Sequence, residues 1–259
     1  MTFKADSRLV HNVVPAANVE ARVAAAMPSL LIMHYTGMSS ATKAIDWLAR
    51  AESRVSCHYV IADDGLITQM VPEAMRAWHA GVSYWRGERD INSHSIGIEI
   101  QNPGHEHGYP EFPRAQMNAV IALGRDIVHR NHMRADGVLA HSDVAPERKI
   151  DPGEKFNWAE LARHGLGEWV RASPVRDGGD VYCAGMQNDV ILEAQQLLGA
   201  YGYDVAPTGT LDVPTTKVLR AFQLHFRPHR VDGLLDRSTL NTLTRLVDAA
   251  GRMPPIHVA

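Results

Sequence analysis

The stretch from His141 to Phe156, HSDVAPERKIDPGEKF, holds the densest group of residues in the chain that could do chemistry. It combines a histidine with charged side chains of both signs and with proline, and it follows the short apolar run Gly137–Ala140. Such a composition behind a buried strand is typical of a loop that is organised by a bound ion or a reacting group. We therefore predict a loop that carries chemistry, and a metal ion is the simplest occupant.

Two carboxylates could join His141 as metal ligands. Asp143 lies two residues further on, so on an extended segment its side chain would face the same way as that of His141. Asp151 lies ten residues further on and reaches His141 only if the loop turns back. Asp143 is equally compatible with a turn at the end of a strand, in which its carboxylate bonds backbone amides. The spacing leaves the choice between the two carboxylates open.

A second histidine closes a buried strand. The run from Leu30 to Thr36, LLIMHYT, is apolar up to His34 and is followed by Gly37, which predicts a central strand. The end of such a strand opens into a loop and is a usual place for a ligand or catalytic group in α/β proteins. His34 is therefore a candidate ligand, and the alternative is a hydrogen-bonded histidine of the core.

A carboxylate lies on a third strand. The segment Ser95–Gln101 alternates, so that its isoleucines face one side while Gly97 and Glu99 face the other. If the isoleucines pack against helices, Glu99 points out of the opposite face, and Gly97 beside it leaves room for a substrate. The pattern is compatible with an exposed strand carboxylate and with a catalytic one.

The elements around these residues predict an α/β fold with a central mixed β-sheet flanked by helices, over residues 1–170. Residues 1–28 read as an irregular lead-in. The predicted elements are a helix from Ser39 or Ser40 to about Ala51, a hairpin of strands 58–61 and 66–71 around an Asp-Gly turn, a helix over 114–131, and a helix from the cap Asn157 to about Arg171.

The C-terminal third has a different pattern. Residues 171–185 combine Pro, Gly and charge without periodicity and predict a linker. Residues 186–250 predict a small three-helix domain that begins with a helix over 190–198, and residues 251–259 a loose tail. Five residues recur in the same order 24 positions later, each set supplying a turn glycine and a capping aspartate: Gly209, Leu211, Asp212, Thr215 and Leu219, then Gly233, Leu235, Asp236, Thr239 and Leu243.

Composition excludes several classes of function. A formal net charge of −3 over 259 residues argues against a nucleic-acid partner held by bulk charge. Two cysteines, Cys57 and Cys183, are too few for a disulfide framework and predict free thiols. No apolar run approaches the ~18 residues of a membrane span, and the N-terminus lacks a signal-peptide core. We therefore expect a cytoplasmic protein, and the cell envelope is the alternative.

Five motifs together resemble the zinc-dependent N-acetylmuramoyl-L-alanine amidases of type 2, relatives of phage-lysozyme amidases and of peptidoglycan recognition proteins. They span about residues 28–160 and are, in order, LLIMHYT, SCHYVIADDGLITQMVPE, AWHAG, SIGIEI and AHSDVAPERKIDPGEKF. The resemblance implies one Zn²⁺ per chain, held by His34, His141 and Asp151, and so favours Asp151 over Asp143. It also implies catalytic roles for Glu99 and Lys149.

The same resemblance implies the reaction, which is hydrolysis of the amide between N-acetylmuramic acid and the L-alanine of peptidoglycan stem peptides. Whether the substrate is the intact wall, a soluble muropeptide or its 1,6-anhydro form is left open. Trp78 and His79 would line the substrate groove. Ser93 stands where many relatives have Asp, a departure that we expect to affect loop stability or substrate contacts.

The C-terminal segment resembles the three-helix peptidoglycan-binding domain, in AQQLLGAYGY, TGTLDVPTTKVLRAFQ and VDGLLDRSTLNTL. A peptidoglycan or muropeptide partner follows from both resemblances. The alternative function is a non-catalytic peptidoglycan receptor, which the loss of a zinc ligand would indicate, whereas this chain retains all three.

Overall fold

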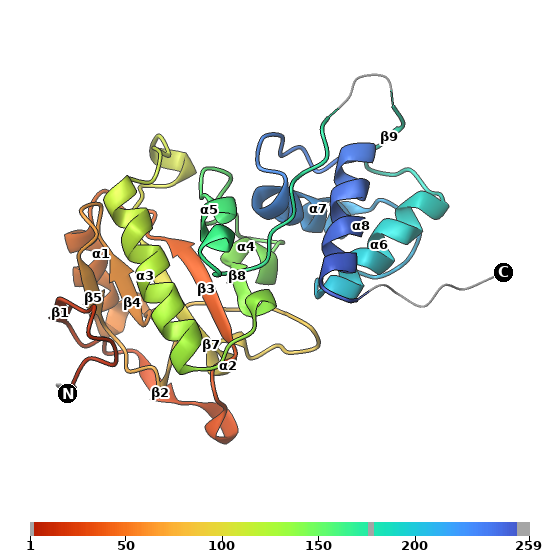
Figure 1. Ribbon diagram of the computed structural model, residues 1–259. Helices are drawn as coiled ribbons and strands as arrows, with labels where there is room; N and C mark the ends of the chain where they lie inside the picture. Colours follow the sequence, from red (N-terminus) through yellow and green to blue (C-terminus); the bar gives the residue numbers. More distant parts are fainter. Residues whose placement is uncertain (1–2, 176–178, 253–259) are drawn as a thin grey trace.

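The structure, a computed structural model, describes residues 3–175 and 179–252 (Figure 1). A six-stranded mixed sheet forms the centre of the N-terminal part. Its strands, in spatial order, are β1 (Asn12–Val13), β5 (Ile67–Gln69), β4 (Tyr59–Ile61), β7 (Ser95–Ile100), β3 (Leu30–Tyr35) and β8 (Val138–Ala140). A smaller sheet pairs β2 (Val19–Ala21) with β6 (Met75–Ala77). The predicted central mixed sheet is confirmed.

The helices and 3-10 turns of this part fill the connections between strands. The helices are α1 (Ala41–Leu48), α2 (Ile91–His94), α3 (Arg114–Arg130), α4 (His141–Val144) and α5 (Trp158–Arg163). The 3-10 turns are Val23–Ala25, Ala51–Ser53, His105–His107 and Ala135–Gly137. The α1 helix begins at the predicted cap, because the Ser40 hydroxyl accepts a hydrogen bond from the Lys43 amide.

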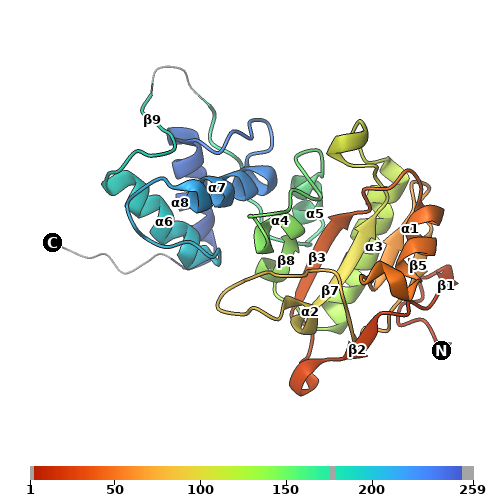
Figure 2. The ribbon, with the colours of Figure 1, turned by 180° about the vertical axis from the view of Figure 1, so that it is seen from behind.

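Different elements pack against the two faces of the central sheet. The isoleucines of β7 and alternate residues of β3, Leu31 and Met33, pack in one core with α3, as the alternation predicted. Figure 1 shows α3 in front of β3 and β7, and Figure 2 shows it behind them. The other face, which carries His34 and Glu99, therefore remains for α1, for the loops at the strand ends and for the C-terminal helices.

Three local predictions were wrong. Residues 1–28 are not an irregular lead-in, because β1 pairs with β5 and β2 pairs with β6. The segment from His141 begins with the short helix α4 rather than with loop. The α5 helix ends at Arg163 and not near Arg171, since Gly165, at φ +75°, takes the chain out of the helix after one and a half turns.

The C-terminal part contains the three predicted helices: α6 (Asp189–Tyr201), α7 (Val213–Phe226) and α8 (Arg237–Ala249). Each copy of the 24-residue repeat supplies the predicted capping aspartate. Asp212 and Asp236 accept hydrogen bonds from the amides of Thr215 and Thr239, at 2.8 and 2.7 Å, and so cap α7 and α8. We call residues 181–252 the helical module. It also holds a strand pair that the sequence did not predict, β9 (Val181–Tyr182) with β10 (Leu235–Asp236).

The segment predicted as a linker is partly bound to the helical module. The Ser173 amide donates to the Thr242 hydroxyl of α8 at 2.9 Å, and β9 lies within the predicted range. Residues 176–178 of the linker and 253–259 of the tail lie outside the described residues. None of the helices over 3–175 and 179–252 is long and apolar enough to cross a membrane.

Candidate metal centre

Three neighbouring parallel strands bring the candidate side chains to one edge of the sheet. In the pairing of β3 with β7, His34 lies directly opposite Glu99. In the pairing of β3 with β8, Met33 lies opposite Ala140, so that His141 follows the last paired residue and comes beside His34. The carboxyl ends of parallel strands meet at one edge of a sheet, which is the usual position of an α/β active site.

Asp151 reaches this edge because its loop folds back. The Ser142 amide donates to the Asp151 carbonyl at 3.0 Å, which ties the end of the loop to its beginning. The loop then turns through the cis peptide Asp151–Pro152 and is held by Tyr109, whose hydroxyl donates to the Pro152 carbonyl at 2.6 Å. Spacing alone did not reveal this return.

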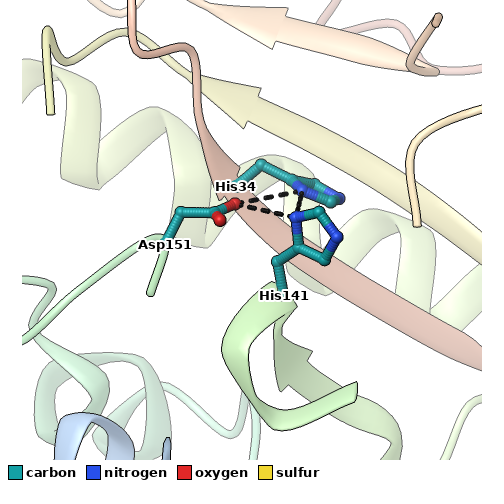
Figure 3. Close-up of side chains that lie close together, drawn as sticks. All are labelled: His34, His141 and Asp151. Atoms are coloured by element: carbon teal, nitrogen blue, oxygen red, sulfur yellow. Dashed lines mark hydrogen bonds and ion pairs between the residues drawn. The ribbon is translucent and has the colours of Figure 1, made fainter. Parts of the chain in front are cut away.

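The three side chains converge on one point (Figure 3). The Asp151 Oδ2 atom lies 3.2 Å from His34 Nδ1 and 3.0 Å from His141 Nδ1, and the two Nδ1 atoms are 2.9 Å apart. All three residues are buried. Ligands of a tetrahedral zinc ion at ~2.0–2.1 Å stand about 3.3 Å from one another, close to this triangle. Two imidazoles and one carboxylate are also a donor set that zinc accepts, so the residues fit a catalytic zinc ion.

The electrostatics favour the charge states that a metal site needs. Burial opposes ionisation of Asp151, but the neighbouring imidazoles of His141 and His34 outweigh it and hold the pKa of the carboxyl well below its usual range. Burial, together with the proximity of His141, lowers the pKa of His34 to about 4. A carboxylate and a neutral imidazole are therefore present at neutral pH.

Glu99 lies next to this triangle with a different electrostatic balance. Its Oε2 atom is buried and has no hydrogen-bond partner among the described residues. Burial raises the pKa of Glu99 well above its usual value, and the nearby Asp151 carboxylate raises it further. An unpartnered carboxyl with a raised pKa in a pocket is a candidate for the group that takes up and releases a proton in a reaction.

Two basic residues precede Asp151 and differ in their contacts. Arg148 donates from Nη2 to the carbonyls of Ala80 and Val82, so its guanidinium is used to hold the segment after His79. Lys149 is half-buried and lines the same pocket as the three converging side chains. Lys149 thus supplies a cation near Glu99 and His34, and its positive charge acts to lower the pKa of both groups.

The pocket above the triangle has a volume of about 590 Å³. Its outer wall carries three apolar side chains that are each roughly 40% exposed: Trp47, Val55 and Ile150. The 3-10 turn His105–His107 also lines the pocket. The pocket thus combines a polar floor with an apolar rim, as is typical of sites for ligands of moderate size.

Trp78 and His79 both border this pocket, at different depths. Trp78 is half-buried, whereas His79 is buried with its Nδ1 atom 2.9 Å from His34 Nε2 and its Nε2 atom 3.0 Å from the Ser95 hydroxyl. The space beside Gly97 is filled by this ring, since a Cβ at Gly97 would lie 2.5 Å from His79 Cγ. The interpretation that Gly97 leaves room for substrate was therefore wrong.

Asp143, the other candidate ligand, points away from the triangle. Its Oδ2 atom accepts a hydrogen bond from the Ala140 amide at 2.8 Å, as the turn alternative predicted. The same carboxylate is bonded by His225 Nδ1 at 2.7 Å and by the Tyr203 hydroxyl at 2.6 Å. These two contacts with the helical module had no signal in the sequence.

The remaining comparisons with the sequence interpretation concern Ser93, the two cysteines and two polar residues that the interpretation missed. Ser93, the position at which relatives differ, accepts a hydrogen bond from the Val23 amide at 3.1 Å, so its contact is structural. Cys57 is buried and Cys183 exposed, and within the described chain both are free thiols, as predicted. Sequence reasoning missed Ser95 and Asn92, although Ser95 lies on the same strand face as Glu99.

Both parts of the chain are similar to known proteins. Residues 24–154 match the family model described as N-acetylmuramoyl-L-alanine amidase, and residues 187–243 match that of a peptidoglycan binding domain. The N-acetylmuramoyl-L-alanine amidase AmiD of Escherichia coli (strain K12) is 36% identical over 240 residues, which cover 86% of this chain and 83% of AmiD.

Two solved structures are similar over most of their length. The complex of E. coli AmiD with the substrate anhydro-N-acetylmuramic acid-L-Ala-D-gamma-Glu-L-Lys has a TM-score of 0.74 at 34% identity, and covers 90% of this chain and 94% of AmiD. AmpDh3 of Pseudomonas aeruginosa in complex with anhydromuramic pentapeptide has a TM-score of 0.71 at 30% identity, over 86% of this chain and 92% of AmpDh3.

Proposed function

The chain belongs to the N-acetylmuramoyl-L-alanine amidase family, and from this premise we propose how its residues cut the bond and which form of the substrate it takes. It is a hydrolase of the amide that joins N-acetylmuramic acid to the L-alanine of a peptidoglycan stem peptide. The observation that carries the proposal is the convergence of His34, His141 and Asp151 beside Glu99.

The two histidines and Asp151 would hold one zinc ion. Three protein ligands leave a fourth tetrahedral position open, which is the arrangement of catalytic rather than structural zinc. When bound, zinc supplies Lewis acidity that polarises the amide carbonyl and activates water near neutral pH.

Glu99 is the proton carrier of this proposal. Its carboxylate would orient the attacking water, accept a proton at one oxygen and release that proton to the leaving amine of L-alanine. The raised pKa of Glu99, caused by burial and by the nearby Asp151 carboxylate, favours acceptance of a proton by this carboxylate. Among the described residues, the buried Oε2 atom of Glu99 has no hydrogen-bond partner. This oxygen is therefore available to accept the proton of the water.

Lys149 would stabilise the negative charge that develops on the carbonyl oxygen. A preorganised cation in a water-poor pocket acts more strongly there than in bulk water. The adjacent Arg148 cannot take this role as it stands, since it bonds the carbonyls of Ala80 and Val82.

We propose a muropeptide with the 1,6-anhydro sugar as the substrate. The support is that AmiD and AmpDh3, which are similar over most of this chain, form complexes with anhydromuramic peptides. The 590 Å³ pocket has room for a sugar and the first residues of a stem peptide. Trp78, half-buried at the wall, remains a predicted substrate contact.

The test is product analysis by mass spectrometry with two substrates, a purified anhydro-muropeptide and intact sacculi, each with and without a zinc chelator. We expect release of free stem peptide from the anhydro-muropeptide, its loss on chelation, and its return when zinc is added back. Faster cleavage of sacculi would contradict the substrate assignment but not the reaction. No cleavage of either substrate with zinc bound would instead indicate a non-catalytic peptidoglycan receptor.

A further inference from the structure

The outer ring nitrogens of the two candidate ligand histidines are held by two consecutive residues. His34 Nε2 lies 2.9 Å from His79 Nδ1, and His141 Nε2 lies 3.1 Å from the carbonyl oxygen of Ala80. All of these side chains are buried. One short segment therefore contacts both imidazoles from behind, on the side away from Asp151.

The direction of the hydrogen bonds at His141 is unambiguous. A carbonyl oxygen can only accept, so the Nε2 atom of His141 carries the proton and donates it to Ala80. In a neutral imidazole the other nitrogen then has a free lone pair. For His141 that nitrogen is Nδ1, the atom that faces Asp151 and His34.

The direction at His34 follows from a longer chain of contacts. The Ser95 hydroxyl donates its one proton to the Ile91 carbonyl at 2.6 Å, so towards His79 its oxygen acts as an acceptor. His79 must then carry its proton on Nε2, which leaves Nδ1 as an acceptor for the Nε2 proton of His34. The Nδ1 atom of His34 is consequently also without a proton.

The segment itself is fixed by Asn92. The Asn92 Oδ1 atom accepts hydrogen bonds from the backbone amides of His79 at 3.0 Å and of Ala80 at 2.8 Å. Gly97 provides the space for the His79 ring, since no side chain fits there. The Asn92 hydrogen bonds and the space beside Gly97 together fix the position of the His79–Ala80 segment relative to the His34 and His141 rings.

We propose that the His79–Ala80 segment, anchored by Asn92 and Ser95, is a positioning element that sets the tautomer and orientation of both ligand histidines. With these tautomers, the Nδ1 lone pairs of His34 and His141 and the Asp151 carboxylate all face a single point. This arrangement is favourable only with a cation at that point. His79 is thus a positioning residue rather than a substrate contact. The inference depends on the proposed metal site.

The test compares two replacements of His79 by zinc affinity, measured in competition with a chromophoric chelator. His79→Leu removes the acceptor, whereas in His79→Asn the Oδ1 atom replaces Nδ1 as the acceptor. We expect His79→Leu to bind zinc roughly 10- to 100-fold more weakly and His79→Asn to recover most of that loss. Asn92→Ala, which touches no imidazole, should weaken binding in the same direction, and His129→Leu, at an exposed position of α3, should not.

A second readout does not depend on affinity. Long-range ¹H–¹⁵N spectra of the wild-type protein assign the protonated nitrogen of each histidine, and we expect Nε2 for His34, His79 and His141. Folding of each variant is checked by circular dichroism, so that an unfolded variant is not counted. Zinc affinity of folded His79→Leu equal to that of the wild type, or a proton on His34 Nδ1, would overturn the inference. Failure of the wild type to bind zinc would overturn the proposed function instead.

Discussion

The Tyr203 hydroxyl donates a 2.6 Å hydrogen bond to the Asp143 carboxylate, and so joins the helical module to the short helix that begins at His141. Both side chains are buried, and His225 bonds the other oxygen of the same carboxylate at 2.7 Å. Lys217 adds an exposed ion pair to Glu147 at 2.6 Å. The segment that carries His141 is therefore packed against the helical module rather than separated from it by a free linker.

Replacement of Tyr203 by Phe should lower the free energy of unfolding by about 1–3 kcal/mol, because a buried carboxylate loses a donor that nothing replaces. The measurement is urea denaturation of the whole chain at neutral pH. Tyr182→Phe is the matched control, since the half-buried Tyr182 side chain lies at the edge of the helical module and its change should stay within about 0.5 kcal/mol. Equal effects of the two changes would contradict a specific role for the Asp143 contact.

Glu99→Gln should abolish turnover and leave zinc bound. The amide keeps the size of the side chain but cannot accept and return a proton, so kcat should fall about 10²- to 10⁴-fold. Cleavage of the anhydro-muropeptide is followed by mass spectrometry, and zinc content by atomic absorption. Glu111→Gln, at an exposed carboxylate, is the control. A Glu99→Gln protein that retains full activity would remove Glu99 from the mechanism.

Gly97→Ala should disturb the His79 ring. The added Cβ would lie 2.5 Å from His79 Cγ, so we expect a loss of about 1–3 kcal/mol in unfolding free energy together with weaker zinc binding. Gly199→Ala is the matched control, because Gly199 lies on an exposed face of α6 with no heavy atom within 4 Å of the added Cβ. That change should be neutral or stabilise the protein by up to about 1 kcal/mol. Similar losses in both variants would argue against the close approach at Gly97.

Stability of the chelator-treated protein should fall as the pH is lowered. Burial, with Arg22 nearby, lowers the pKa of His58 to about 3, whereas the unfolded chain has a value of ~6.5. The unfolded state therefore binds more protons between these two values, so stability is lost as the pH falls below about 6.5. His34, with its pKa lowered to about 4, acts in the same direction.

The measurement is the urea midpoint at pH 7 and at pH 5, which should be lower at pH 5. His58→Asn keeps an acceptor for the Gly97 amide, which His58 Nδ1 accepts at 3.0 Å, but removes the titrating group. This variant should show a smaller difference between the two pH values. An unchanged difference would mean that His58 does not contribute to the acid sensitivity.

The sequence by itself determined the elements and the list of chemical groups. Alternation placed the isoleucines of β7 against α3 and Glu99 on the other face, because successive residues of a strand point to opposite sides. The repeat predicted the caps Asp212 and Asp236, because each aspartate accepts a hydrogen bond from the backbone amide of the residue three positions further along the chain. These features depend on local geometry, which is why a pattern in the chain is sufficient to find them.

Only the tertiary structure decided which of these groups meet. Asp151 reaches His34 and Asp143 reaches Tyr203 because a loop folds back and a distant helix packs beside it, contacts that spacing along the chain does not encode. The same holds for His79, whose partners His34 and Ser95 come from two different strands. Residue types were sufficient to name the candidate groups, whereas the way in which they meet required the long-range packing that brings four separate segments to one edge of the sheet.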